Sequence, residues 1–463
     1  MSVQTTDLVA LVHLGCARNL IDSELILGRM ADEGLVVTGD PAEAHTVVLN
    51  TCSFIGPARE ESHSAIRDLV ARKEAGELGA VVVAGCLVQR YKHTLARQYP
   101  GVDVFAEISD YRELAKSIKR ISEGDSGHDR YLAGPGLREP AREGSRLLAT
   151  PGSYAYLRIS HGCDHTCSFC AIPGIRGPHR SKRPAAVLEE AEELIGAGVK
   201  ELVVVAEDST AWGRDFGMEL PQLIESLADL DGDARVRIMY AYPNRFPWDL
   251  ARLLAEHPKV LPYLDIPIQH AATNTLRAMR RAGSGDQVRK ILDRLKSEVP
   301  DLTLRTTVLL GFPGETDEDA AQVVDLVRDY GLSRLGAFTY SPEEGTPGFD
   351  LDGAVPEDVA EARRDAVLAE RDAQLKKTQE AAIGTTVEVL VDEPPDPDGG
   401  FICGRAATDA PEVDMITFAH APEASVGDRI QVRIDGVDEE FNWIGARVDA
   451  DADASAPGGG EGS

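Results

Sequence analysis

The sequence lacks any hydrophobic run that could span a membrane, because no stretch of about 18 consecutive apolar residues occurs in its 463 residues. Its amino terminus, MSVQTTDLVALVHLGC, lacks the basic residues that precede the apolar part of a secretory signal peptide. We therefore expect a cytoplasmic protein with no membrane partner. The chain contains neither G-x-x-x-x-G-K-[ST] nor G-x-G-x-x-G, so nothing in it points to ATP or a dinucleotide.

Basic charge is scarce, since 48 Lys and Arg residues stand against 77 Asp and Glu residues and the formal net charge is -29. Such a chain repels polyphosphate on average, so nucleic acid is a disfavoured partner and a basic protein a favoured one. Cysteine is scarce too, and seven residues in a chain of this length exclude a disulfide-based scaffold. In a reducing cytosol, clustered cysteines indicate metal ligands or catalytic groups.

The hydrophobic pattern divides the chain into successive units. Residues 1–120 alternate β-branched runs with helical stretches, which predicts a parallel α/β domain, and a Gly- and Pro-rich linker follows at 121–153. Six strand-helix units at 154–380 predict an incomplete TIM-like barrel of the (β/α)6 kind. Period-two alternation at 384–449 predicts a small antiparallel β-barrel. The low-complexity tail 450–463 is expected to be disordered.

The segment GCDHTCSFC places Cys163, Cys167 and Cys170 on one short loop after the first strand of the predicted large barrel. Three thiolates can bind three irons of a [4Fe-4S] cluster and leave the fourth iron open to a small-molecule ligand. A structural zinc site is the less favoured alternative. Zinc would need a fourth ligand such as His161 or His165, and its ligands usually come in two separated pairs.

This loop resembles that of the radical S-adenosylmethionine (SAM) superfamily, in which an aromatic residue usually precedes the last cysteine, as Phe169 does here. The resemblance implies that the open iron chelates the amino and carboxylate groups of SAM, and that an electron from the cluster cleaves SAM to methionine and a deoxyadenosyl radical. We expect SAM to lie across the carboxyl ends of the barrel strands, where barrels place their active sites.

A second set of cysteines is dispersed along the first domain. Cys16, Cys52 and Cys86 each follow a predicted strand, namely LVALVHLG, TVVLNT and AVVVAG. The carboxyl ends of parallel strands share one edge of a sheet, so these thiols can converge there on a second cluster. The alternative is that they are buried cysteines that merely cap strands.

Three segments of the first domain resemble motifs of the methylthiotransferase family, namely GCARNLIDSE, NTCSFI and AGCLVQR. The resemblance extends through the barrel in the segments GCDHTCSFCAIPGIRGPHRSKRP, TTVLLGFPGETDED and YSPEEGTPG. The last domain resembles a TRAM domain. In that family the three amino-terminal cysteines hold a second [4Fe-4S] cluster, which carries the sulfur to be methylated and inserted. This sequence has Cys-Ala-Arg-Asn where relatives often have Cys-Pro-Lys-Asn, and we expect no chemical consequence because Cys16 and Asn19 are retained.

Further polar and glycine residues follow the predicted barrel strands. By resemblance, SAM-binding residues beside Phe169 are Glu207, Asp208, Gly311, Gly314 and Glu315, although turn formation or helix capping accounts for each equally well. Gln269, His270 and the segment 340–345 occupy comparable positions. Three arginines, Arg176, Arg180 and Arg183, are expected either to neutralise a carboxylate of SAM or substrate or to face solvent.

Four other candidates are expected to have no role in the site. His13, His45 and His63 are single histidines near strands or on a helix, and we expect structural or solvated side chains rather than ligands. Cys403 lies within a strand of the terminal barrel and is expected to be a small core residue. No catalytic residue is assigned beyond the six cluster cysteines.

Members of the resembled family methylthiolate either an adenosine in tRNA or an aspartate in a small-subunit ribosomal protein. Residues 384–449 hold fifteen acidic residues against four arginines and no lysine, which favours a basic ribosomal protein over RNA, although a generally acidic proteome would also explain it. The spellings RIMYAYP and LDIPIQHA resemble the ribosomal-protein branch, which modifies the twelfth protein of the small subunit. A tRNA enzyme and a non-enzymatic iron-sulfur carrier or redox sensor remain the alternatives. We expect a monomer, and the sequence names no sulfur donor or reductant.

The resemblance implies a reaction in two halves. One SAM methylates sulfur on the amino-terminal cluster, and a second SAM is cleaved at the barrel cluster to a radical that removes hydrogen from the β-carbon of the aspartate. The carbon radical must then meet the methylthio group within contact distance. The two cysteine sets are therefore expected to face each other across the interface of the first two domains.

Overall fold

The computed structural model describes residues 8–125, 127–135, 144, 146–281 and 283–448, so the tail 450–463 lies outside the described residues. The amino-terminal domain contains one parallel sheet in the strand order β2-β1-β3-β4-β5-β6. Its strands are β1 (Leu8–His13), β2 (Val36–Thr38), β3 (Thr46–Thr51), β4 (Ala80–Gly85), β5 (Val104–Ala106) and β6 (Tyr131–Leu132). Its helices are α1 (Ala17–Asp32), α2 (Gly56–Glu74), α3 (Cys86–Tyr91), α4 (His93–Gln98) and α5 (Arg112–Ser122). The short strand β6 lies within the stretch expected to be a linker and pairs with β5.

The central domain contains six parallel strands in the order β14-β13-β12-β11-β10-β7, as the sequence predicts for an incomplete barrel. These strands are β7 (Tyr154–Arg158), β10 (Glu201–Val205), β11 (Arg235–Ile238), β12 (Val260–Asp265), β13 (Thr303–Leu310) and β14 (Arg334–Thr339). The connecting helices are α7 (Pro184–Gly196), α8 (Leu220–Ala228), α9 (Asp249–Glu256), α10 (Thr273–Ala278), α11 (Gly285–Glu298) and α12 (Asp317–Tyr330), and the long α13 (Glu357–Ala381) packs on α12 and β14. Short elements after β7 and β10 are β8 (Ser160–His161), α6 (Ile172–Arg176), β9 (Arg180–Ser181), η2 (Ser209–Ala211) and η3 (Arg214–Phe216).

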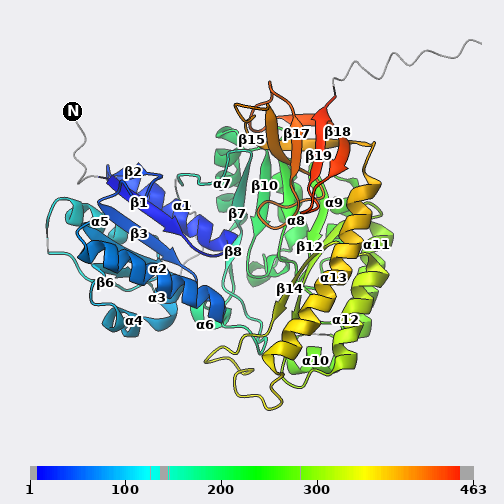
Figure 1. The fold of residues 1–463 in the computed structure, drawn as a ribbon, viewed down its shortest axis with the longest axis horizontal. Helices are drawn as coiled ribbons and strands as arrows, with labels where there is room; N and C mark the ends of the chain where they lie inside the picture. The colour runs from blue at the N-terminus through cyan, green and yellow to red at the C-terminus, as the bar shows by residue number, and fades with distance from the viewer. Residues whose placement is uncertain (1–7, 126, 136–143, 145, 282, 449–463) are drawn as a thin grey trace, which may run out of the picture.

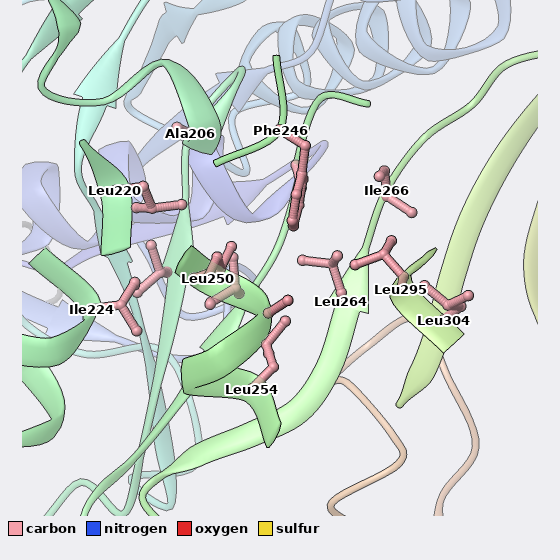
Figure 2. Close-up of a cluster of buried hydrophobic side chains, with 14 of the residues drawn as sticks. Ala206, Leu220, Ile224, Phe246, Leu250, Leu254, Leu264, Ile266, Leu295 and Leu304 are labelled. Atoms are coloured by element: carbon pink, nitrogen blue, oxygen red, sulfur yellow. The ribbon is translucent and has the colours of Figure 1, made fainter. Parts of the chain in front are cut away.

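Alternating side chains of these strands meet the helices in one large hydrophobic core. Figure 2 shows part of it, where Leu220 and Ile224 of α8, Leu250 and Leu254 of α9 and Leu264 of β12 converge. Burial of a leucine side chain stabilises a fold by about 2 kcal/mol, so this layer holds the strands in register. The carboxyl ends of the strands are thereby held rigidly for the residues that follow them.

The carboxy-terminal domain is a closed five-stranded barrel of β15 (Thr386–Glu393), β16 (Phe401–Ala406), β17 (Thr417–His420), β18 (Arg429–Val437) and β19 (Trp443–Arg447). The small β-barrel is confirmed, but β17 and β19 pair in parallel, so it is not wholly antiparallel. The expectation that Cys403 belongs to its core is wrong. Alternation along β16 buries Ile402 inside the barrel and leaves Cys403 half-buried on the other face.

The two outer domains contact opposite ends of the central strands, with the blue amino-terminal domain at one side and the red barrel at the top of Figure 1. Arg158, the last residue of β7, binds Asp22 of α1 at 3.0 Å. At the other end Arg405 of the terminal barrel binds Glu201, the first residue of β10, at 3.2 Å. No helix within the described ranges is long and apolar enough to cross a membrane.

Candidate active site

The first cysteine set lies along one edge of the amino-terminal sheet. Cys16 precedes α1, Cys52 follows β3 and Cys86 opens α3, and β1, β3 and β4 are neighbours in the sheet. Two glycines make the close approach possible. At Gly15, whose φ is 113°, an added Cβ would lie 3.2 Å from the Sγ of Cys52, and at Gly85, whose φ is 94°, it would lie 2.2 Å from Asn50 Oδ1. The predicted convergence of these three strand ends is therefore present.

Positive charge surrounds this set. Arg176 of α6 reaches across from the central domain, and its Nη2 lies 3.2 Å from the Sγ of Cys86 while its Nη1 donates to Asp22 at 2.7 Å. Burial by itself would raise the pKa of Cys16, but Arg18 and Arg176 hold that pKa below its ordinary value. Burial raises the pKa of Cys86 to about 11 despite Arg176. The surroundings therefore favour thiolate most strongly at Cys16.

The second set lies on the loop between β8 and α6. Its three thiols are close enough to influence one another, because Cys167 raises the pKa of both Cys163 and Cys170. Burial is the larger cause and raises these pKa values to about 12 and about 11 respectively. Arg281 places its Nη1 3.7 Å from the Sγ of Cys167. Binding of a positively charged metal cluster is the natural way to stabilise such buried thiols as thiolates.

A cavity of about 190 Å³ lies between the amino-terminal domain and the carboxyl ends of the central strands. Arg18 and Phe54 reach it from the first domain, and all three cysteines of the second set border it. The other bordering residues are His165, Phe169, Ile172, Glu207, Tyr240, Ala241, Tyr242, Pro267, Gln269, Arg281 and Thr307. The sequence-based expectations for Phe169 and Glu207 as cavity residues thus agree with their positions.

The donors present suit SAM and an iron-sulfur cluster better than zinc. The Oε2 atom of Glu207 is buried without a hydrogen-bond partner, although Arg18 and Arg176 lie near enough to interact with its charge, so this oxygen can accept a hydrogen bond from a ligand group such as the amino group of SAM. Within the described part of the chain, no three His, Cys, Asp or Glu side chains converge where a single metal ion would fit. A four-iron cluster offers a separate iron to each thiolate, so its ligands need not converge in this way.

Several expected SAM contacts do not border the cavity. Asp208 accepts hydrogen bonds from His165 Nε2 at 2.7 Å and Thr210 at 2.6 Å, so it positions His165, whose ring stacks on Tyr242 at 3.7 Å. Its carboxylate is therefore satisfied by the protein itself. Gln269, by contrast, borders the cavity with its backbone in the left-handed region at φ 72°.

The carboxylate of the Gly311–Glu315 loop is already bonded by the protein. The Oε2 atom of Glu315 accepts the N–H groups of Gly311 at 2.9 Å and Phe312 at 3.4 Å, and its Oε1 atom pairs with Arg363 at 3.0 Å. Gly311 and Gly314 have φ values of 76° and 83°, and none of the described cavity residues comes from this loop. The structure therefore supports the alternative of a turn that prepares α12. His270 is fully buried beside Glu315 and does not reach the cavity either.

The segment after β14 contacts the amino-terminal domain. Glu343 is 1% exposed and pairs with Arg59 of α2 and, at 2.9 Å, with Arg90 of α3. Ser341 Oγ accepts the N–H of Gly56 at 3.1 Å. Since α2 and α3 follow Cys52 and Cys86, this segment fixes the first cysteine set relative to the central barrel.

The remaining candidates fall outside the cavity. Arg180 borders a separate cavity, and Arg183 stacks over Phe216 at 4.5 Å. Among the histidines expected to be structural, His13 contacts Ser23 at 3.0 Å and His63 contacts Tyr99 at 2.7 Å, while His45 packs against Gly79.

Sequence reasoning identified Phe169 but missed the arginines and tyrosines of the cavity. Arg18 stands two residues after Cys16 in the motif GCARNLIDSE, but the resemblance draws attention only to the thiol of Cys16 and to Asn19. Tyr240 and Tyr242 belong to the segment RIMYAYP, whose resemblance pointed to the ribosomal-protein branch of the family but to no role for either tyrosine. The available signal was position, because both tyrosines directly follow a predicted barrel strand.

An incomplete parallel barrel that carries three cysteines on the loop after its first strand defines a radical SAM protein. Family models agree along the chain. The Radical SAM superfamily matches residues 157–327, the uncharacterized protein family UPF0004 matches residues 8–107 and the TRAM domain matches residues 383–446.

Curated relatives extend over nearly the whole chain. The ribosomal protein uS12 methylthiotransferase RimO of Acetivibrio thermocellus is 39% identical over 94% of this chain and 97% of its own length. The protein of the same name from Sorangium cellulosum is 40% identical over 95% of this chain and 91% of its own length. This chain belongs to the family of ribosomal protein uS12 methylthiotransferases.

Solved structures share the fold at low sequence identity. The radical SAM methyltransferase TsrM of Kitasatospora setae, with cobalamin and a [4Fe-4S] cluster bound, aligns with a TM-score of 0.54 and 18% identity over 74% of this chain and 77% of its own. The cobalamin-dependent SAM radical enzyme OxsB aligns with a TM-score of 0.51 and 13% identity over 80% of this chain and 56% of its own.

Proposed function

We propose that the protein is a radical SAM methylthiotransferase that modifies the β-carbon of an aspartate in ribosomal protein uS12. The observation that carries the proposal is a cavity bordered by all three cysteines of the second set and by Arg18 of the first domain, which stands two residues after Cys16 of the first set. A reaction that joins a methylthio group to a carbon radical needs both components within contact distance. The family membership agrees with this reading, because the relatives are uS12 methylthiotransferases.

The two cysteine sets are the proposed cofactor ligands. Cys16, Cys52 and Cys86 would hold one [4Fe-4S] cluster, and Cys163, Cys167 and Cys170 would hold the other. When bound, the clusters supply the electron that cleaves SAM and the sulfur that is methylated and inserted. The protein's own side chains orient the reactants. Glu207 offers a carboxylate to the amino group of SAM, and the rings of Phe169 and Tyr242 border the space for its adenosyl part and exclude water.

The terminal barrel is the proposed docking surface for the basic substrate protein, but fewer of its acidic residues are available than the composition suggests. Asp392 and Asp409 are buried and pair with arginines, and Asp449 lies outside the described residues. Exposed acidic residues remain at Glu393, Asp396, Asp398, Glu412, Glu423, Asp428, Asp435, Glu439 and Glu440. These would attract a basic ribosomal protein and repel RNA. We also propose that the enzyme acts as a monomer in the cytoplasm, where ribosomes are.

The substrate assignment is tested by incubating the reconstituted enzyme with SAM, a reductant and a sulfide source under anaerobic conditions. Purified uS12 and total tRNA are supplied in separate reactions. We expect mass spectrometry to find a methylthio group on one aspartate of uS12, with no change in tRNA nucleosides. Modification of tRNA alone would establish the tRNA alternative. Absence of deoxyadenosine from every reaction would contradict the proposal and favour a non-enzymatic iron-sulfur carrier or redox sensor.

A further inference from the structure

Arg18 occupies a distinctive position between the two cysteine sets. It lies in the first turn of α1, and its side chain leaves the amino-terminal domain and enters the shared cavity. Its Nη1 donates to the carbonyl oxygen of Ala206 at 3.2 Å, and its Cζ lies 4.7 Å from the ring centroid of Tyr240. The hydrogen bond and the aromatic ring fix the plane of the guanidinium group before any ligand arrives.

Arg18 links the two cysteine sets in space. It follows Cys16 of the first set by two residues, and it borders the cavity that Cys163, Cys167 and Cys170 of the second set also border. A guanidinium has five N–H donors, and the bonds to Ala206 and to the thiol of Cys16 use two of them, so donors remain for a carboxylate.

Tyr240, the residue beneath Arg18, has its backbone in the left-handed region at φ 60°. A non-glycine residue adopts this conformation at a cost, and such residues concentrate where a ligand needs a particular side-chain position. The N–H of Tyr240 donates to Asp265 Oδ2 at 3.1 Å, and Asp265 in turn pairs with Arg305 at 3.0 Å. These buried contacts keep the Tyr240 ring under Arg18.

The proposed substrate brings a carboxylate into this space, because the carbon that reacts is bonded to the side-chain carboxylate of the aspartate. Burying that charge beside cysteine thiolates is unfavourable unless a cation pairs with it. Arg281 is the other cation at the cavity, but it stacks on Tyr242 at 3.9 Å, donates to Pro267 O and approaches Cys167. Arg281 is thus engaged on the side of the second cysteine set.

Resting on the proposed function, we infer that Arg18 is the receptor for the side-chain carboxylate of the substrate aspartate. It binds the two carboxylate oxygens side by side and holds the β-carbon between the cysteine sets. A planar guanidinium fits a carboxylate in this bidentate manner, whereas a neutral amide gains no charge-assisted bond. Arg18 therefore makes the enzyme select aspartate over asparagine.

The test compares binding of uS12 with binding of a uS12 variant in which asparagine replaces the target aspartate. Equilibrium affinity is measured by fluorescence anisotropy on the anaerobically reconstituted enzyme as wild type, Arg18→Met, Arg18→Lys and Arg294→Met. Arg294 is the matched control because it stacks over Trp248 at 3.7 Å and does not border the cavity. Affinity for SAM, iron content and the visible absorption of the clusters are recorded for each variant.

We expect wild type and Arg294→Met to prefer the aspartate form by about 30-fold, in line with a charge-assisted bond. Arg18→Met should lose this preference, with affinity for SAM within about 2-fold of wild type. Arg18→Lys introduces the residue that relatives often carry here and keeps the charge without the fork, so it should retain a reduced preference of about 5-fold. The role inferred for Arg18 therefore replaces the expectation that the Arg-for-Lys difference has no chemical consequence.

Any one of three outcomes overturns the inference. An unchanged preference in Arg18→Met does so, and so does a selective loss of SAM affinity, which would assign Arg18 to the carboxylate of SAM instead. If Arg18→Met fails to retain iron, Arg18→Lys decides, because a full 30-fold preference in that loaded variant also contradicts the role. A wild-type enzyme that does not modify uS12 would refute the proposed function itself, whereas an active wild type with an indifferent Arg18→Met would refute only this inference.

Discussion

Both ends of the central barrel bury ion pairs, but they differ in one carboxylate, that of Glu207. At the end covered by the terminal barrel, Arg405 pairs with Asp392 at 2.6 Å and with Glu201 at 3.2 Å, and Arg334 pairs with Asp409 at 2.8 Å. At the other end, Glu207 leaves a buried oxygen unpaired. Paired charges fix the position of a domain, while an unpaired buried charge is costly and persists where a ligand will satisfy it.

This contrast also changes the meaning of the acidic terminal barrel. Part of its negative charge neutralises arginines of the central domain and is unavailable to any partner. Tyr263 donates to Asp414 at 2.5 Å and Tyr156 to Glu412 at 3.0 Å, so the loop between β16 and β17 meets inward side chains of the central strands. The terminal barrel is therefore a fixed cover of that end as well as a candidate docking surface.

The largest expected effect comes from breaking the paired end. Arg405→Met leaves Asp392 and Glu201 buried with one cation fewer, and we expect a loss of about 3–5 kcal/mol in the free energy of unfolding. Chemical denaturation measures it. Arg433→Met is the matched control, because Arg433 pairs with Asp435 on the exposed surface of the same barrel and should cost about 0.5 kcal/mol or less. Equal losses in the two variants would show that the buried pairs do not hold the cover in place.

The second-largest expected effect is a dependence of stability on pH through Glu201. Burial would raise the pKa of Glu201, but Arg237 and Arg405 lower it to about 2, below its ordinary value of 4.5. Because the folded state binds this proton less tightly than the unfolded chain, the carboxylate stabilises the fold above about pH 4.5 and loses its contribution as the pH falls toward 2. We expect about 3 kcal/mol from this group at neutral pH.

The measurement is the free energy of unfolding of wild type and Glu201→Gln between about pH 7 and pH 4. The difference between the two proteins should be largest at neutral pH and should begin to shrink as the pH approaches 4.5. Two parallel curves would contradict the assignment of a depressed pKa to Glu201.

The smallest effect on stability is expected at the ligand end. Glu207→Gln removes a carboxylate whose Oε2 atom makes no hydrogen bond within the protein, so the free energy of unfolding should change by about 0.5 kcal/mol or less while affinity for SAM falls about 10-fold. Asp208→Asn sharpens the contrast, because Asp208 is paired with His165 and should lose about 1–2 kcal/mol of stability. Calorimetric titration with SAM and denaturation curves separate the two patterns, and a stability loss in Glu207→Gln would place Glu207 among the structural charges.

The sequence predicts most of the fold because strands and helices have periods that can be read locally. The runs TVVLNT and AVVVAG become β3 and β4, and the cysteines after them lie along one edge of the sheet because parallel strands end at one edge. The role of the Gly311–Glu315 loop could not be predicted in this way, because a glycine-containing turn that binds a ligand and one that caps a helix can have the same sequence. The position of Arg18 and the pairing of Glu201 with Arg405 depend on contacts between domains, which local patterns do not encode.

The central claim is that the two cysteine sets serve different steps around one cavity. The most direct measurement follows deoxyadenosine formation from SAM in two triple variants, one with alanine at Cys16, Cys52 and Cys86 and one with alanine at Cys163, Cys167 and Cys170. We predict that the first variant still cleaves SAM but yields no methylthio product, and that the second does neither. Equal loss of SAM cleavage in both variants, with the folds intact by circular dichroism, would contradict the account.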